Sequence, residues 1–327
     1  MKFWVFLVLA FVVLLSSCQI FFLAGVYEEL QDKYGIVYIY VSKNGNDAND
    51  GLSVSTPVRS LPRAMDIASG IEGNKRVEVR VEVGVYSKGD GLSSPNVPNA
   101  GFVIIRPNIT ISGGWDSSFS SVVGNSVLDG NNSLYHIIEI SGVTNVVLRN
   151  IQIMRGAAKD NIIPNDRGGG IYVENVSYLV IESNVIVSDN FAINGGGLFL
   201  RSLTNSTISC DILNNKSTWG GGINLQNSSY NTISGNVHNN SANQYGGGLF
   251  LGFSTYTTIS GSVYGNYAST YGGGVYLQDS DYFTNTGWIT NNTAGTTYGG
   301  GGVYRVGSYT NSYFGNVSGN TSEDIYP

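Results

Sequence analysis

Aromatic side chains recur at fixed places in the second half of the sequence. One set stands two residues after the last glycine of a glycine run, and a second set stands directly before the first glycine. Together they are Tyr172, Phe199, Trp219, Tyr245, Phe250, Tyr271, Tyr276, Tyr298 and Tyr304. Flat rings beside glycines, which carry no side chain, would form a groove in which sugar rings stack, or an aromatic face for another protein. We call these residues the candidate binding ladder; the simpler alternative is that equivalent rings stack on one another and need no ligand.

Carboxylates are the side chains from which a glycosidase would be built, because acid–base cleavage of a glycosidic bond needs two of them a short distance apart. The candidate acids in the second half are Glu174, Glu182, Asp189, Asp211, Asp279 and Asp281. Asp189 and Asp211 fall in adjacent repeats but at different places within the repeat. His136 and His238 have no partner nearby in the sequence. No catalytic residue is therefore assigned, and a non-catalytic protein is favoured, with a polysaccharide lyase or a glycoside hydrolase as the alternative.

The stretch from residue 44 to residue 51 is dense in Asn, Asp and Gly. Asp47, Asn49 and Asp50 offer the hard oxygen ligands that Ca²⁺ prefers. The stretch lacks the spacing and the terminal Glu of an EF-hand, whereas Asn, Asp and Gly are the residues that tight turns require. A turn is therefore expected here, and no metal and no cofactor are assigned.

The glycine runs repeat with a nearly constant period. Their last glycines are residues 170, 197, 222, 248, 274 and 302, so successive copies lie 27, 25, 26, 26 and 28 residues apart. A fixed period of this size indicates stacked supersecondary units. The aliphatic residues one and three places after the last glycine are expected to face a core, and the residue between them is expected to face outward.

Each repeat also carries an Asn three residues after a Val or an Ile. These are Asn190, Asn215, Asn240, Asn266, Asn292 and Asn320. In a stack of coils the equivalent residues form columns, and Asn side chains in a column can hydrogen-bond to one another. Glycine at the corner before a strand supplies backbone angles that other residues adopt only with strain.

The first half of the chain predicts short strands and one helix. Residues 37–42 form a β-rich run, and residues 77–83 alternate strictly between Val and charged side chains, which is typical of a half-buried strand. Residues 60–68 suit a short helix, since Ser60 can cap it and Pro62 is tolerated in its first turn. Further short apolar runs without a helical period favour an all-β coil.

Two stretches carry a resemblance to known proteins. Residues 40–57, followed by a helix with Ala64, resemble the opening of bacterial right-handed parallel β-helix proteins of the pectate-lyase-like type. The Asn and glycine pattern resembles the repeats of chlamydial polymorphic outer-membrane proteins, which have Phe and Gly-Gly-Ala where this chain has Val or Ile and Gly-Gly-Gly. The resemblance implies one single-stranded right-handed parallel β-helix over 37–327, with an N-terminal cap at 37–70 and regular repeats at 168–327.

The N-terminus has the layout of an export signal. Lys2 precedes a long apolar run, and Leu15-Ser16-Ser17-Cys18 resembles a bacterial lipobox, which implies a signal peptide over 1–18, acylation of Cys18 and a tether over 19–36. An uncleaved membrane anchor is the alternative, because apolar residues resume after Cys18. The other cysteine, Cys210, lies among apolar residues and is expected to be buried and structural.

The net charge of the protein limits the kinds of partner that are expected to bind it. The net charge of −6 and the pI of about 4.9 argue against binding nucleic acid, whose phosphates need a basic surface. The sequence therefore predicts a non-catalytic, lipid-anchored protein of the bacterial cell envelope or surface that binds carbohydrate or protein in the manner of an adhesin.

Overall fold

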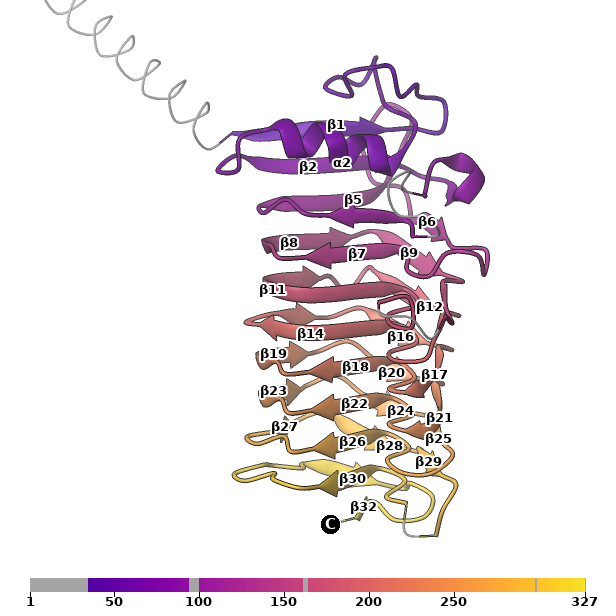
Figure 1. Ribbon diagram of the computed structural model, residues 1–327, viewed down its shortest axis with the longest axis vertical. Helices are drawn as coiled ribbons and strands as arrows, with labels where there is room; N and C mark the ends of the chain where they lie inside the picture. The colour runs from indigo at the N-terminus through magenta and orange to yellow at the C-terminus, as the bar shows by residue number, and fades with distance from the viewer. Residues whose placement is uncertain (1–34, 94–99, 161–163, 298, 327) are drawn as a thin grey trace, which may run out of the picture.

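The chain forms a stack of coils whose strands run parallel from one coil to the next. A computed structural model describes residues 35–93, 100–160, 164–297 and 299–326. In these residues the strands form parallel sheets of 17, 9 and 6 members. Figure 1 shows them as a tall stack that follows the chain from β1 at the top to β32 at the bottom. The fold is an all-β parallel β-helix with one short α-helix, as the sequence predicts.

The 17-stranded sheet covers two sides of each coil. β18 and β19, for example, lie on either side of a bend at Asn227, whose φ is +50°. Its members are β1 (Ile36–Val41), β2 (Arg76–Glu82), β4 (Phe102–Ile104), β5 (Ile109–Trp115), β7 (Ile138–Ser141), β8 (Thr144–Arg149), β11 (Ile171–Ile181), β14 (Leu198–Thr204), β15 (Thr207–Ile208), β18 (Ile223–Gln226), β19 (Ser229–Ile233), β22 (Leu249–Gly252), β23 (Thr255–Ile259), β26 (Val275–Gln278), β27 (Thr284–Asn285), β30 (Val303–Val306) and β32 (Ile325–Tyr326).

The two smaller sheets complete each coil. The nine-stranded sheet consists of β3 (Val85–Ser87), β6 (Ser126–Asp129), β9 (Ile151–Met154), β12 (Ile186–Ser188), β16 (Asp211–Leu213), β20 (Val237–His238), β24 (Val263–Tyr264), β28 (Trp288–Thr290) and β31 (Asn316–Ser318). The six-stranded sheet consists of β10 (Ala157–Ala158), β13 (Phe191–Ala192), β17 (Lys216–Trp219), β21 (Ser241–Tyr245), β25 (Tyr267–Ala268) and β29 (Thr293–Ala294). The helical elements are α2 (Leu61–Gly70) and the short 3₁₀ helix η1 (Lys88–Asp90).

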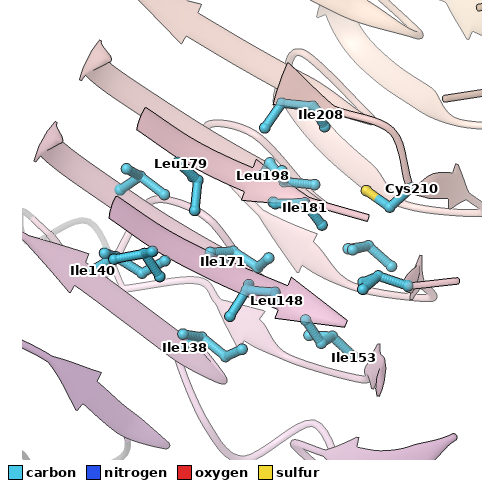
Figure 2. Close-up of a cluster of buried hydrophobic side chains, with 14 of the residues drawn as sticks. Ile138, Ile140, Leu148, Ile153, Ile171, Leu179, Ile181, Leu198, Ile208 and Cys210 are labelled. Carbon is cyan, nitrogen blue, oxygen red and sulfur yellow. The ribbon is translucent and has the colours of Figure 1, made fainter. Parts of the chain in front are cut away.

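The interior is a continuous column of aliphatic side chains. Ile138, Ile171 and Leu198 are register partners on three successive coils, and all three are fully buried. Figure 2 shows these side chains beside their neighbours inside the coil, with the sulfur of Cys210 among them. Burial raises the pKa of the Cys210 thiol above its usual range, so the side chain packs as a small apolar group. The prediction of a buried structural cysteine is confirmed.

The last three glycines of each run have different structural roles. The first has a left-handed backbone, with φ of +67° at Gly220 and +66° at Gly246, which glycine adopts without steric cost. The next two need room instead. A Cβ at Gly221 would lie 2.3 Å from the carbonyl oxygen of Gly247, and one at Gly222 would lie 2.8 Å from that of Gly248. The run therefore turns the corner and also lets adjacent coils approach closely.

The N-terminal end of the stack is covered by α2, as Figure 1 shows. The Ser60 side chain caps the helix by accepting from the Arg63 amide, and Asp47 holds Ser60 in place by accepting from its amide at 2.9 Å and its hydroxyl at 2.8 Å. Asp50 accepts from the Leu52 amide and the Thr56 hydroxyl. These carboxylates thus shape the predicted turn by hydrogen bonds within the cap.

A ladder of buried asparagines joins the coils. Each side-chain amide donates to the Oδ1 of the equivalent Asn on the next coil, at 3.0 Å between Asn215 and Asn240 and at 3.1 Å between Asn240 and Asn266. Each also donates to a main-chain carbonyl, for example Asn240 to Ile212 at 2.9 Å. The predicted Asn column is therefore hydrogen-bonded from coil to coil, although its members from Asn190 to Asn292 are buried.

The chain end covers the last regular coil. β32 pairs with β30, and the Tyr326 ring stacks on Tyr304 with centroids 5.2 Å apart. Asp324 Oδ1 accepts from both the main-chain and the side-chain nitrogen of Asn320 at 2.9 Å, which ends the Asn ladder with a carboxylate. These last residues thus cover the end of the coil stack, although the sequence contains no segment there that is recognisable as a cap.

Replacing Asn240 with Ala is expected to lower the free energy of unfolding by about 3 kcal/mol, because neighbouring buried groups lose their partners. The matched control is Asn243→Ala, three residues further along on β21, where the side chain is exposed and little change is expected. Urea unfolding followed by circular dichroism measures both. Equal midpoints for the two variants would contradict the stabilising role of the ladder.

Candidate functional site

The coil stack arranges the candidate binding ladder in two adjacent columns. Tyr172, Phe199, Phe250, Tyr276 and Tyr304 occupy one register position of β11, β14, β22, β26 and β30, with Asn224 of β18 between Phe199 and Phe250. The rings stack along this column, with centroids 5.8 Å apart for Tyr172 and Phe199 and 5.2 Å apart for Phe250 and Tyr276. We call it the inner column.

A second column stands across the glycine corner. Trp219, Tyr245 and Tyr271 are bridge partners of one another. Their rings lie against the inner column, with centroids 4.9 Å apart for Tyr245 and Tyr276 and 4.4 Å apart for Tyr271 and Tyr304. We call this the outer column, and the two columns together the aromatic strip. Tyr298 lies outside the described residues.

The expectation that the inner column faces solvent is wrong for most of its members. Tyr172, Phe199, Phe250 and Tyr276 are 3%, 0%, 7% and 8% exposed. Their rings lie outside the aliphatic core, as predicted, but side chains from the neighbouring column cover them. The Arg167 guanidinium, for example, lies 4.9 Å from the Phe199 ring centroid. Stacking between rings therefore accounts for most of the strip, and Trp219 is exposed at its edge.

The strip opens at one place. A cavity of about 200 Å³ lies over β22, with Trp219 and Tyr245 on one wall and the rings of Phe250 and Tyr276 beneath. Its other lining residues are Gln226, Gly252, Phe253 and Gln278. We call this cavity the aromatic groove. It is lined by aromatic rings, two primary amides and one glycine, and none of its lining residues is charged.

Gly252 creates the opening. It shares a register position with Arg201, Gln226 and Gln278, so a side chain is missing from a column that otherwise carries long polar ones. A Cβ at Gly252 would lie 2.9 Å from Cε1 of Phe250. The edge of the Phe250 ring therefore occupies the place of the absent side chain, between two glutamines.

Phe253 borders the same opening and is conformationally unusual. It has a φ of +51°, a left-handed conformation that costs an ordinary L-residue about 1 kcal/mol or more. The equivalent bends of other coils use residues that tolerate it: Gly142, Asn175, Ser202, Asn227, Asp279 and Gly307. The ring is nevertheless 56% exposed, so burial does not explain it. The same backbone conformation occurs at Phe119, Tyr178, Tyr230, Tyr256 and Tyr282, so what distinguishes Phe253 is its place beside the opening.

Sequence reasoning did not identify Phe253 or Gly252. The signal is present, because Phe253 is the one bulky residue at a bend position filled elsewhere by Gly, Asn, Ser or Asp among the described coils. The departure at Phe253 is visible only when the repeats are aligned at the ends of their strands. The glycine runs align the repeats at the starts of the strands instead.

The strip is charged toward its N-terminal end. The Tyr172 hydroxyl donates to Glu174 Oε2 at 2.7 Å, and Arg201 forms an ion pair with the same carboxylate. The hydrogen bond from Tyr172 and the pairing with Arg201 lower the pKa of Glu174. Glu139 of β7 lies next to Tyr172 in register, and burial, with the nearby charge of Glu174, raises its pKa.

Among the other candidate acids, Asp279 and Asp281 lie close together, since both accept hydrogen bonds from Ser308, whereas Glu182 and Asp211 have separate partners. Glu182 pairs with Arg149 at 3.4 Å, and Asp211 accepts from Asn236 at 3.1 Å. Asp279 and Asp281 accept hydrogen bonds from the segment 308–310. Across the described ranges, no group of three or more His, Cys, Asp and Glu residues is arranged to hold a metal ion.

The two histidines differ in setting. His136 is buried, stacks on Tyr172 with ring centroids 5.3 Å apart, and its Nδ1 lies 3.0 Å from the carbonyl oxygen of Arg167. His238 stacks on Tyr264 at 4.8 Å on the nine-stranded sheet. His136 therefore belongs to the charged end of the strip, and His238 lies in another sheet.

Comparisons with known proteins give a structural likeness without a family. No protein-family description matches the sequence, and no curated protein matches it. Among solved structures, the native GH136 lacto-N-biosidase from Eubacterium ramulus aligns with a TM-score of 0.34 at 12% identity over 92% of this chain and 69% of the other. The selenomethionine form of that enzyme aligns with a TM-score of 0.33 at 12% identity over 88% and 67%.

Replacing Phe253 with Asn is expected to raise the free energy of unfolding by about 1 kcal/mol, since Asn tolerates the left-handed backbone that Phe resists. The reciprocal change, Asn227→Phe at the equivalent bend, is expected to lower it by a similar amount. Urea midpoints of the two variants provide the measurement. A destabilised Phe253→Asn protein would show that ring packing outweighs the strain.

Proposed function

We propose that the protein binds a neutral carbohydrate chain in the aromatic groove. The observation that carries the proposal is the pairing of a missing side chain at Gly252 with a strained, exposed ring at Phe253. Aromatic faces stack on the apolar faces of sugar rings, and such platforms work best at a site already shaped to receive them. Together Trp219, Tyr245 and Phe253 give the groove rings on both of its walls.

The lining favours a neutral ligand. Gln226 and Gln278 flank the opening, and each amide offers both donors and an acceptor to sugar hydroxyls. The nearest charges on the same column, Arg201 and Glu174, neutralise one another as an ion pair. A uronic acid would find no unpaired cation there, whereas hydroxyl groups find two amides.

The size of the groove argues against a protein partner as its occupant. A stable protein interface buries roughly 800 Å² on each partner. A cavity of about 200 Å³ accommodates instead a small group such as a sugar unit. Of the two predicted kinds of ligand, carbohydrate is therefore the one that the groove supports.

We further propose that the protein acts at the cell envelope, anchored by lipid at Cys18. The support is the apolar run that ends in Leu15-Ser16-Ser17-Cys18, which lies outside the described residues. In the described part of the chain, no helix has the length and apolar character needed to cross a bilayer. A tether over 19–36 would then present the groove to glycans around the cell, as an adhesin does.

Replacing Trp219 with Ala is expected to weaken binding of a neutral oligosaccharide about tenfold, because one stacking wall is lost. The matched control is Trp288→Ala, an exposed tryptophan on β28 of the nine-stranded sheet, which should bind as the unmodified protein does. A glycan array identifies the ligand, and titration calorimetry measures the affinity.

Two results would count against the groove. One is equal loss of affinity in the Trp219 and Trp288 variants. The other is exclusive binding of acidic glycans, which the uncharged lining does not explain.

Replacing Cys18 with Ala is expected to move the protein from the membrane fraction to the soluble fraction of its bacterial host, since acylation requires the thiol. Fractionation with metabolic labelling by a fatty-acid analogue checks this. Retention in the membrane without label would support the uncleaved anchor instead.

A further inference from the structure

We propose that the charged end of the aromatic strip is a hydrolytic centre for the glycan held in the groove, with Glu139 as general acid and Glu174 as general base. The inference rests on the proposed carbohydrate binding. It adds a reaction to that binding and assigns it to two carboxylates on adjacent coils.

Register places the two carboxylates on one face. Glu139 of β7 pairs with Tyr172 of β11, and Glu174 lies two residues further along β11, opposite Ser141. Residues two apart on a strand point to the same side of the sheet. One strand spacing and two residue rises separate their Cα atoms by roughly 8 Å. Tyr172 is thus directly beside Glu139 and on the same side as Glu174.

Their surroundings differ in the way that acid–base catalysis requires. Glu174 accepts from the Tyr172 hydroxyl at 2.7 Å and pairs with Arg201, and these contacts hold its pKa below the usual value. Glu139 is half-buried and makes no side-chain hydrogen bond or ion pair with any described residue, and burial raises its pKa. Between the two values, one carboxyl carries a proton while the other is ionised.

The charged end connects to the groove along a single column. Glu174, Arg201, Gln226 and Gly252 occupy the same register position on four successive coils. Three coil steps of about 4.8 Å separate Glu174 from Gly252, or roughly 14 Å. A short oligosaccharide along this column would reach both, with one end against Phe253 and the other at the carboxylates.

Asn224 is an independent sign of a ligand along the same path. It interrupts the inner column between Phe199 and Phe250 and is fully buried. Its Nδ2 lies 3.5 Å from the carbonyl oxygen of Trp219, whereas its Oδ1 has no hydrogen-bond donor among the described residues. A buried acceptor without a donor is rare in folded proteins, and a sugar hydroxyl entering between the rings would satisfy it.

The reaction is a single displacement by water. Glu174 removes a proton from a water molecule, whose oxygen forms a bond to the anomeric carbon. The bond from that carbon to the glycosidic oxygen breaks, and Glu139 gives its proton to the leaving oxygen. The products are two sugars, with the elements of water divided between them. Because water attacks in a single displacement, the new anomeric configuration is inverted.

The test uses the full chain with fluorescently labelled neutral oligosaccharides from the glycan array and a panel of aryl glycosides. Release of labelled fragments with inverted configuration, read by nuclear magnetic resonance, is the expected result. Glu139→Gln and Glu174→Gln should each lower kcat/KM at least 100-fold, the scale of general acid–base catalysis. Both variants should still bind the oligosaccharide, because the aromatic groove is unchanged.

The matched control is Glu182→Gln, directly after the same strand but paired with Arg149, which should keep full activity. Binding without cleavage by the unmodified protein would overturn the hydrolytic centre but would leave the proposal of carbohydrate binding in the aromatic groove intact. Absence of both binding and cleavage would overturn the two proposals together. Turnover that survives both Gln variants, or that retains configuration, would overturn the roles assigned to Glu139 and Glu174.

Discussion

Stacking of successive coils at one strand spacing is the constraint on which the rest of the structure depends. It brings main chains so close at the glycine corner that a Cβ at Gly221 would lie 2.3 Å from the Gly247 carbonyl oxygen. It also places buried amides such as Asn215 and Asn240 within hydrogen-bond distance. A backbone held this way needs no disulfide, and Cys210 remains a free thiol in the core.

The same stacking determines where a ligand can enter. In a regular array each ring is covered by its neighbours above, below and across the glycine corner. The rings of an aromatic column are therefore shielded from solvent. Phe199, fully buried under Arg167, illustrates this. An opening needs a departure from the repeat, and Gly252 with Phe253 provides one. The proposed binding therefore rests on residues that break the pattern.

The charged end of the strip follows the same principle. Tyr172 keeps the ring of its column but turns its hydroxyl to Glu174, and Glu139 puts a carboxyl where later coils have rings. Burial raises the pKa of Glu139, whereas the hydrogen bond from Tyr172 and the pairing with Arg201 lower that of Glu174, although both are glutamates on one face. An apolar platform that continues into a pair of unlike carboxyls is an arrangement suited to holding and cleaving a sugar chain.

Periodicity in the sequence determined which residues share a column, because coils of nearly equal length must stack equivalent positions. It was sufficient for the stacked coils and the asparagine ladder, whereas the helix was predicted from Ser60 and Pro62 and the burial of Cys210 from the apolar residues around it. It did not determine what covers a column, which depends on side chains from the neighbouring column one coil away; the burial of Tyr172 and Phe250 follows from that packing. Nor did it place Glu139 beside Tyr172, since the 32 residues between them include an irregular loop, and only the tertiary structure brings the two strands into register.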